Sequence, residues 1–194
     1  MTRRWLKLGA VAGSVIALAF ALTLGLERVM APRTETDTQA TTPPEDATVP
    51  HISATLFLAT AEGDALVPVR MDVPLASSVA EQGREIIAAQ LTAAQLPFVT
   101  PIPPGASLRA FYVTERGEGF IDLSAEAATA HPGGSTAEVL TVYSLVNAVT
   151  ANLPSVTRVQ LLIDGKEVDT LAGHVDLRRT LEKNDEIVQA LPSP

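Results

Sequence analysis

The sequence contains no cysteine and only three histidines among its 194 residues. The missing cysteine excludes disulfide bonds, a thiol nucleophile, thiolate metal ligands and a lipid-modified cysteine. No H-E-x-x-H pair occurs, so a zinc site would have to draw on His131, Glu138, His174 and Asp176 from separate loops. We therefore predict no metal and no cofactor, and we expect packing to stabilise the fold.

Motifs for nucleophilic catalysis and nucleotide binding are also missing. The sequence has no G-x-S-x-G, no G-x-x-x-x-G-K-[ST] and no G-x-G-x-x-G. Glu115, Glu118, Asp122 and Glu126 could supply a glycosidase pair by chance, but charged turns explain these carboxylates more simply. We predict that the protein is not an enzyme. The alternative that stays open is a peptidoglycan-processing or glycan-binding envelope protein.

Basic residues are few in the part of the chain that follows residue 30. Ten Lys and Arg residues stand there against 21 Asp and Glu residues, a formal net charge of −11. A surface of this sign repels nucleic acid and anionic lipid headgroups. We therefore predict no nucleic-acid partner.

One long apolar run, Leu8 to Leu26, carries no charge. Its length of about 19 residues is close to what a helix needs to cross a bilayer. Arg3, Arg4 and Lys7 precede it, which places residues 1–7 in the cytoplasm and the rest of the chain outside it. We predict a single-pass signal anchor at residues 8–26 in the cell membrane. A signal peptide cleaved near Ala31 is the alternative.

Residues 27–51 are rich in Thr, Pro and acidic groups and poor in large apolar side chains. Such a composition predicts a disordered linker that holds the folded part away from the membrane. The folded domain is expected at residues 52–179, and a polar C-terminal tail at residues 180–194.

Alternating apolar residues predict a hairpin from residues 52–60 and 65–73, in which Pro68 requires an edge strand. Ser77 and Ser78 with Glu81 predict a capped helix that runs to about Gln95. Its expected buried residues are Val79, Ile86, Ile87 and Leu91. A proline-rich extended connector follows, then a second hairpin at 107–115 and 120–124.

The stretch HPGGSTAEVLTVYSLVNAV, residues 131–149, predicts a second helix from Ser135 to Asn152. Gly133 and Gly134 supply the chain reversal, and Ser135 with Glu138 is interpreted as a capping box. Anion or glycan binding at this helix start is the alternative. One buried face is expected to contain Val139, Val142, Tyr143, Val146, Val149 and Leu153.

A strand at 157–163, a turn at Asp164 and Gly165, and a short strand complete the domain. The order of elements predicts an α+β fold in which two helices cover one face of a single, mostly antiparallel sheet.

Four stretches, LVPVRMDVP, FIDLSAEAA, HPGGSTAEVLTVYSLVNAV and LLIDGKEVDTLAGHVDLRR, together resemble the GerMN domain of the sporulation and spore-germination GerM family. The resemblance covers about residues 53–179 in the family's order. It carries the family's motif positions onto Asp122, Gly133, Gly134, Ser135, Glu138, Tyr143, Asn147, Asp164, Gly165, Gly173, His174 and Asp176.

The resemblance implies a non-enzymatic envelope module with an αββαβ core, similar to the ring-building motifs of secretion-type channels, preceded by an N-terminal hairpin. It also implies an envelope protein or a second copy as partner, and proximity to peptidoglycan hydrolases. The chain differs from the family pattern in carrying one copy of the domain and in lacking the lipoprotein cysteine frequent in relatives.

Overall fold

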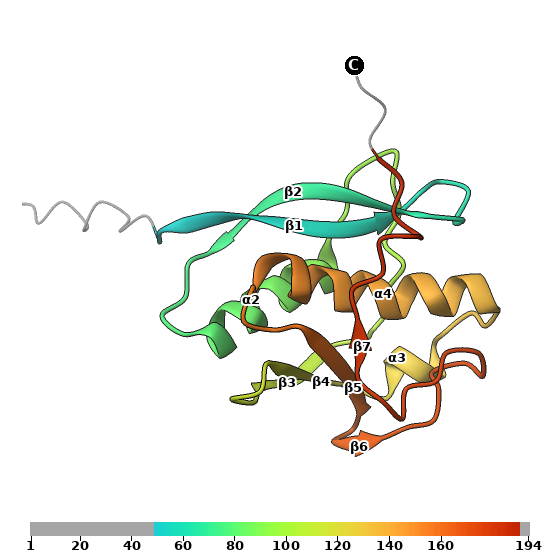
Figure 1. Ribbon diagram of the computed structural model, residues 1–194. Helices are drawn as coiled ribbons and strands as arrows, with labels where there is room; N and C mark the ends of the chain where they lie inside the picture. Colours follow the sequence, from blue (N-terminus) through green and yellow to red (C-terminus); the bar gives the residue numbers. More distant parts are fainter. Residues whose placement is uncertain (1–48, 191–194) are drawn as a thin grey trace, which may run out of the picture. The chain divides into compact units, whose positions relative to one another are not determined.

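The computed structural model describes residues 49–190 (Figure 1). The predicted cytoplasmic segment 1–7, the predicted membrane anchor 8–26 and nearly all of the predicted linker 27–51 lie outside the described residues. None of the helices within residues 49–190 has the length and apolar character needed to span a bilayer.

A two-stranded antiparallel sheet forms the first layer. It consists of β1 (His51–Ala59) and β2 (Leu66–Pro74), which confirms the predicted N-terminal hairpin. Both strands contribute buried side chains to the core, among them Leu56, Leu58 and Val69, and residues 56–59 of β1 are all buried. Pro68 lies in a strand with β1 as its paired strand, as expected for an edge position.

Two helices, α2 (Val79–Thr92) and α4 (Ser135–Asn152), form the middle layer. A short helix α3 (Glu126–Thr129) precedes α4. Figure 1 shows α2 and α4 between the hairpin and a second sheet. Ser78 caps α2 as predicted, because its hydroxyl oxygen accepts a hydrogen bond from the Glu81 N–H at 3.2 Å. The helix ends at Thr92, before the predicted Gln95.

The second sheet has the strand order β3 (Leu108–Val113), β4 (Glu118–Leu123), β5 (Arg158–Ile163) and β6 (Lys166–Glu167). A further strand, β7 (Leu181–Glu182), also pairs with β5. β4 and β5 are parallel because α4 connects them as a crossover, and the other pairs are antiparallel. This arrangement confirms the α+β class.

The prediction of one sheet with helices on one face is wrong, because the hairpin and the β3–β6 sheet lie on opposite sides of the helices. α4 is consequently buried on more than the one predicted face. Leu140, Leu145 and Ala148 are buried in addition to the predicted Val142, Val146 and Val149, whereas Val139 and Tyr143 are only partly buried. A helix between two sheets lacks the polar face from which a one-sided apolar stripe can be recognised.

The first turn of α2 is more exposed than the sequence predicts. Val79 was expected in the core, but it is the first residue of the helix and is 43% exposed, whereas Ile86 and Ile87 are fully buried. Gly83 contacts the ring of Phe111 so closely that a Cβ atom would overlap it. This glycine therefore sets the approach of α2 to β3.

The outer edge of β1 is closed by side chains where a third strand could pair. The Gln90 amide exchanges two hydrogen bonds with the backbone of Phe57, both of 2.8 Å. The Asn152 amide does the same with Thr55, at 2.9 and 2.7 Å. Beyond them, Val99 and Ala59 exchange backbone hydrogen bonds of 2.8 and 2.9 Å.

The predicted tail region contacts the domain as far as the structure describes it. β7 pairs with β5, and Leu66 exchanges backbone hydrogen bonds with Ile187 and Gln189, both of 2.8 Å. The C-terminal segment therefore reaches from the second sheet across to the hairpin (Figure 1).

Candidate functional site

Glu138 lies in the first turn of α4 and is fully buried. Its carboxylate accepts hydrogen bonds from the N–H groups of Leu171 and His174, at 2.9 and 2.8 Å. The His174 Nδ1 atom lies 3.2 Å from the same carboxylate. Glu138 therefore holds the loop that contains the G-H-x-D segment.

The predicted capping box at this helix start is wrong. Gly134, with φ of 89°, occupies the N-cap position of α4, and Ser135 is already the first helical residue. The Glu138 side chain is directed to the loop amides because it has no exposed surface, and a buried carboxylate needs hydrogen-bond donors from the protein.

Two opposing effects set the pKa of Glu138. Burial raises this pKa, while hydrogen bonds from the backbone of Ala172, His174, Val175 and Leu171 lower it, and the net pKa is below the ordinary value of 4.5. The carboxylate is therefore ionised at neutral pH, and its charge strengthens the hydrogen bonds that fix the loop.

The loop held by Glu138 brings the G-H-x-D residues together. Gly173 has φ of 99° and donates its N–H to the Thr170 hydroxyl at 2.9 Å. Asp176 accepts two hydrogen bonds from the Arg178 side chain, at 2.9 and 2.8 Å, and these bonds lower the pKa of Asp176 strongly. An open hollow of about 280 Å³ is lined by five residues of this loop, namely Asp169, Thr170, His174, Asp176 and Arg178.

A second group of motif residues surrounds Arg109. Asp122 accepts a hydrogen bond from the Gly165 N–H at 2.7 Å, and Arg109 bridges Asp122 at 3.3 Å and Asp164 at 2.7 Å. Asp164 and Gly165 both have positive φ, 51° and 74°, which forms the predicted turn after β5. Sequence reasoning did not identify Arg109, because its proximity to Asp164 depends on how β3 and β5 flank β4.

A third contact involves Asn147, which is fully buried on α4. Its side chain donates to the Asn184 carbonyl at 2.8 Å and accepts from the Asn184 N–H at 2.9 Å. Tyr143 is partly buried and packs against the apolar core. The polar motif residues are thus distributed over three separate groups, and each group fixes backbone of a distant segment.

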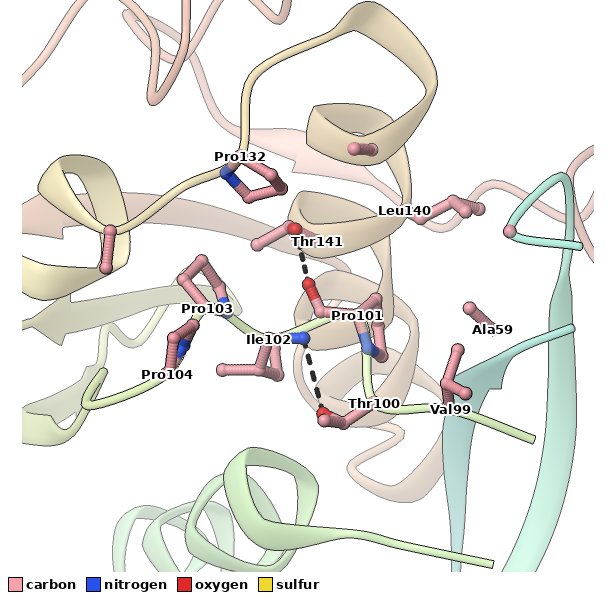
Figure 2. Close-up of a pocket in the computed structure, with 13 residues that line it drawn as sticks. Ala59, Val99, Thr100, Pro101, Ile102, Pro103, Pro104, Pro132, Leu140 and Thr141 are labelled. Carbon is pink, nitrogen blue, oxygen red and sulfur yellow. Dashed lines mark hydrogen bonds between the residues drawn. The ribbon is translucent and has the colours of Figure 1, made fainter. Parts of the chain in front are cut away.

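A hydrogen-bonded chain lies at the N-terminal end of α4. The Gly133 N–H donates to His131 Nδ1 at 3.0 Å, and His131 Nε2 lies 3.2 Å from the Thr141 hydroxyl. Thr141 donates in turn to the Pro101 carbonyl at 2.6 Å (Figure 2). This chain joins the proline-rich connector to α4, and sequence reasoning missed Thr141 because a buried threonine in a helix gives no motif.

Beside this chain lies a largely apolar hollow of about 430 Å³. Figure 2 shows Pro103 and Pro132 on the left, Leu140 and Val99 on the right, and Pro101 between them. No three His, Asp or Glu side chains within residues 49–190 are grouped so that they could hold a metal ion. The arrangement is suited to receiving apolar groups.

Comparison with known proteins gives a family and a set of similar folds. The family model named Germane, described as sporulation and spore germination, matches residues 55–169. No curated protein matches the chain. A crystal structure of a candidate lipoprotein from Clostridium perfringens is 20% identical with a TM-score of 0.50, over 71% of this chain and 91% of that one.

Two further structures come from the sporulation protein GerM of Bacillus subtilis. Its tandem GerMN domains are 18% identical with a TM-score of 0.55, over 69% of this chain and 46% of that one. Its first GerMN domain alone is 16% identical with a TM-score of 0.52, over 70% of this chain and 98% of that one. At these identities the structures show the shared fold, and this chain spans about half of the tandem pair.

Proposed function

The chain belongs to the Germane family of sporulation and spore germination, and on this basis we propose that it is a membrane-anchored, extracytoplasmic assembly module of the bacterial envelope. It binds an envelope protein or a second copy of itself through its surface and catalyses no reaction. The family match agrees with the resemblance found in the sequence.

One observation carries the non-enzymatic part of the proposal. The buried polar motif side chains Asp122, Glu138 and Asn147 are each hydrogen-bonded to backbone of a distant segment of the same chain. Within the described residues, every buried side-chain nitrogen or oxygen atom has a hydrogen-bond partner. Motif residues that hold loops in this way support a scaffold whose work is done by its surface.

The location rests on the sequence together with one relative. The uncharged run at residues 8–26 and the basic residues before it favour a single-pass anchor with the domain outside the cytoplasm. The similar protein from Clostridium perfringens is described as a candidate lipoprotein. This chain has no cysteine to carry a lipid, so a helix takes that place in the proposal.

Crosslinking in native membranes tests the proposed function. The full chain, carrying an affinity tag, is crosslinked in intact cells, purified in detergent and analysed for bound proteins by mass spectrometry. We expect a reproducible envelope protein or a crosslinked second copy. If the chain, expressed at its native level, captures neither an envelope protein nor a second copy, the proposal is contradicted.

A second measurement addresses the peptidoglycan-processing alternative. The purified full chain is incubated with peptidoglycan sacculi, and soluble fragments are quantified for the wild type and for His174→Gln. The His174 imidazole is 44% exposed and lies 3.2 Å from the buried carboxylate of Glu138. His174→Gln is therefore the matched control. Fragment release by the wild type that the variant lacks would overturn the proposal.

A further inference from the structure

Each of the two sheets has two outer edges, and three of these four edges are paired or blocked within residues 49–190. The backbone of β1 bonds the side-chain amides of Gln90 and Asn152. β6 and β7 pair with the outer edge of β5. On β2 the outward-facing residues include Pro68 and Pro74, which have no N–H, and Leu66, which already bonds the C-terminal segment. The remaining edge is that of β3.

The outer edge of β3 presents backbone groups that no other described segment bonds. Thr114 donates its N–H to the Glu118 carbonyl at 2.9 Å, so the backbone of Tyr112, two residues earlier, also bonds β4. The N–H and C=O groups of Phe111 and Val113 therefore point away from β4. No hydrogen bond joins them to another segment within residues 49–190. Figure 1 shows β3 at the border of the second sheet.

An aromatic side chain lies at this open edge. Tyr112 is 57% exposed, and it is the only aromatic residue among the exposed large apolar residues of the described part of the chain. Phe111 is fully buried under α2, where its ring contacts Gly83. Because successive side chains of a strand point to opposite faces, Tyr112 lies on the face turned away from α2. A strand that pairs with β3 therefore meets the tyrosine ring.

Unlike charges stand at equal distances from Tyr112 along the chain. Arg109 lies three residues before it and Glu115 three residues after it. Glu115 is exposed, and the Arg109 side chain is 48% exposed in spite of its bridges to two carboxylates. Two copies of β3 that pair antiparallel about Tyr112 bring Arg109 of each copy toward Glu115 of the other. Parallel pairing would bring like charges together, which is destabilising.

The length of the open edge sets the register of such a pair. The ladder between β3 and β4 is irregular between Leu108 and Ala110, so the regular edge is the stretch 110–113. Its outward-facing residues are Phe111 and Val113. An antiparallel second copy bonds both of them only when its own Val113 lies opposite Phe111, and this register places the two copies of Tyr112 directly opposite each other.

We propose that a second copy of this chain pairs with β3 along this edge, antiparallel and about a two-fold axis at Tyr112. Phe111 of each copy exchanges both backbone hydrogen bonds with Val113 of the other, and the two Tyr112 rings lie side by side. The pairing occupies the open edge of both copies, so it closes at a dimer. The inference rests on the proposed function, of which it names the partner and the surface.

An extended segment of another protein has the same backbone groups and is the competing occupant. The placement of Arg109 and Glu115 about Tyr112 favours the second copy, because only an antiparallel copy of the same strand presents both unlike charges at the matching positions. The two occupants can be separated by experiment. The chain contains no cysteine, so an introduced thiol reports on one position alone.

The first test uses the full-length chain with Tyr112→Cys in its membranes under a mild oxidant. We expect a disulfide-linked dimer, because directly opposite residues of this kind have Cα atoms about 4.5 Å apart. Ala110→Cys is the matched control on the same strand and the same face. In the proposed register the two copies of residue 110 are about 13 Å apart along the strand, too far for a disulfide. No dimer with Tyr112→Cys, or equal amounts with Ala110→Cys, overturns the inference.

The second test removes one outward N–H group. Val113→Pro leaves the bonds to β4 intact, and we expect it to weaken self-association of the full chain in detergent by about tenfold or more. Arg70→Pro is the control, because Arg70 is exposed and its N–H also points outward, on β2. It should leave self-association unchanged. Tyr112→Glu, a change at an exposed side chain, gives the same loss if Val113→Pro does not fold. Wild-type self-association in a folded variant at position 113 or 112 contradicts the inference.

Three outcomes separate this inference from the proposed function. A chain that captures an envelope protein but gives no disulfide-linked dimer through position 112 overturns the inference alone. A chain that captures neither an envelope protein nor a second copy overturns both. A thiol-directed crosslinker at position 112 that captures a different protein and no second copy identifies a foreign strand as the occupant and overturns the inference.

Discussion

Two helices of this protein begin with the same four-residue pattern and use it differently. Ser78-Val79-Ala80-Glu81 precedes and opens α2, and Ser135-Thr136-Ala137-Glu138 opens α4. In α2 the serine caps the helix, and Glu81 stays exposed and accepts a hydrogen bond from the Ser77 hydroxyl at 2.6 Å. In α4 a glycine takes the cap position and the glutamate is buried against a loop more than 30 residues away.

The difference shows how a local signal loses to a tertiary contact. Gly133 and Gly134 have φ of 82° and 89°, so the chain enters α4 one residue earlier than the serine would allow. This leaves the buried Glu138 carboxylate free to accept hydrogen bonds from the N–H groups of Leu171 and His174. A charged acceptor for buried donors is worth more than a solvent-exposed cap.

The largest expected effect comes from Glu138→Ala. Removing the fully buried carboxylate leaves the N–H groups of Leu171 and His174 without their acceptor, so we expect a loss of about 3–5 kcal/mol in the free energy of unfolding. Glu81→Ala, the matched change in α2, should cost far less because Glu81 is exposed. Urea unfolding of both variants checks the comparison. Similar losses of unfolding free energy in the two variants would mean that both glutamates contribute equally to stability.

Acidification should weaken the same contact without a mutation. The folded pKa of Glu138 is lowered, so the stability it provides is present above its ordinary value of 4.5 and is lost as the pH falls through the lower, folded value. We expect stability to decline below about pH 4.5. Urea unfolding across this range should show a shallower decline in Glu138→Gln than in Glu81→Gln. Parallel curves for the two variants would refute the assignment.

Gly134→Ala tests the glycine that replaces the serine as cap. A side chain at φ of 89° and ψ of 141° is strained, although there is open space around the position. We expect a cost of about 1–3 kcal/mol in thermal unfolding. Ser78→Gly should cost only a few tenths of a kcal/mol, because glycine is tolerated as a cap. A cost at position 134 as small as that at position 78 would argue against the described helix start.

Ser78→Ala removes the cap that the structure shows at α2. The N–H of Glu81 then loses its side-chain acceptor. We expect a loss of about 0.5–2 kcal/mol, measured by thermal unfolding. Ser77→Ala is the control, because Ser77 bonds only the exposed Glu81 side chain in this helix start.

Ser135→Ala should have the smallest effect. Ser135 is exposed at the first helical position of α4 and the cap position is Gly134. We expect a change below about 0.5 kcal/mol, within the range typical of surface substitutions. A loss as large as that of Ser78→Ala would restore the capping interpretation of this serine.

The sequence allowed the α+β class, both long helices and the strands other than β7 to be predicted, because each has its own local pattern. It did not allow the second sheet to be separated from the first. That separation depends on α4 being apolar on opposite sides, where Thr141, Ser144 and Asn147 interrupt the pattern although all three are buried. Their hydroxyl and amide groups are bonded to helix or loop backbone, which no spacing rule reveals.

The candidate site shows a similar limit. The polar residues assigned to the family pattern lie in three separate groups, and the sequence did not indicate this grouping. Arg109 between Asp122 and Asp164, and Asn184 opposite Asn147, come from segments with no motif of their own. Such partners become visible only when strand order and loop paths are known.

The closed border of β1 bears on how copies of this protein could accumulate. Addition of a strand from another copy needs a row of unpaired backbone N–H and C=O groups. On β1 the side-chain amides of Gln90 and Asn152 already bond the N–H and C=O groups of Phe57 and Thr55. Growth of a cross-β fibre by strand addition at this edge of β1 is therefore disfavoured. Contacts between copies along this edge would have to form through side chains, and closed symmetry can limit such contacts to a fixed number of copies.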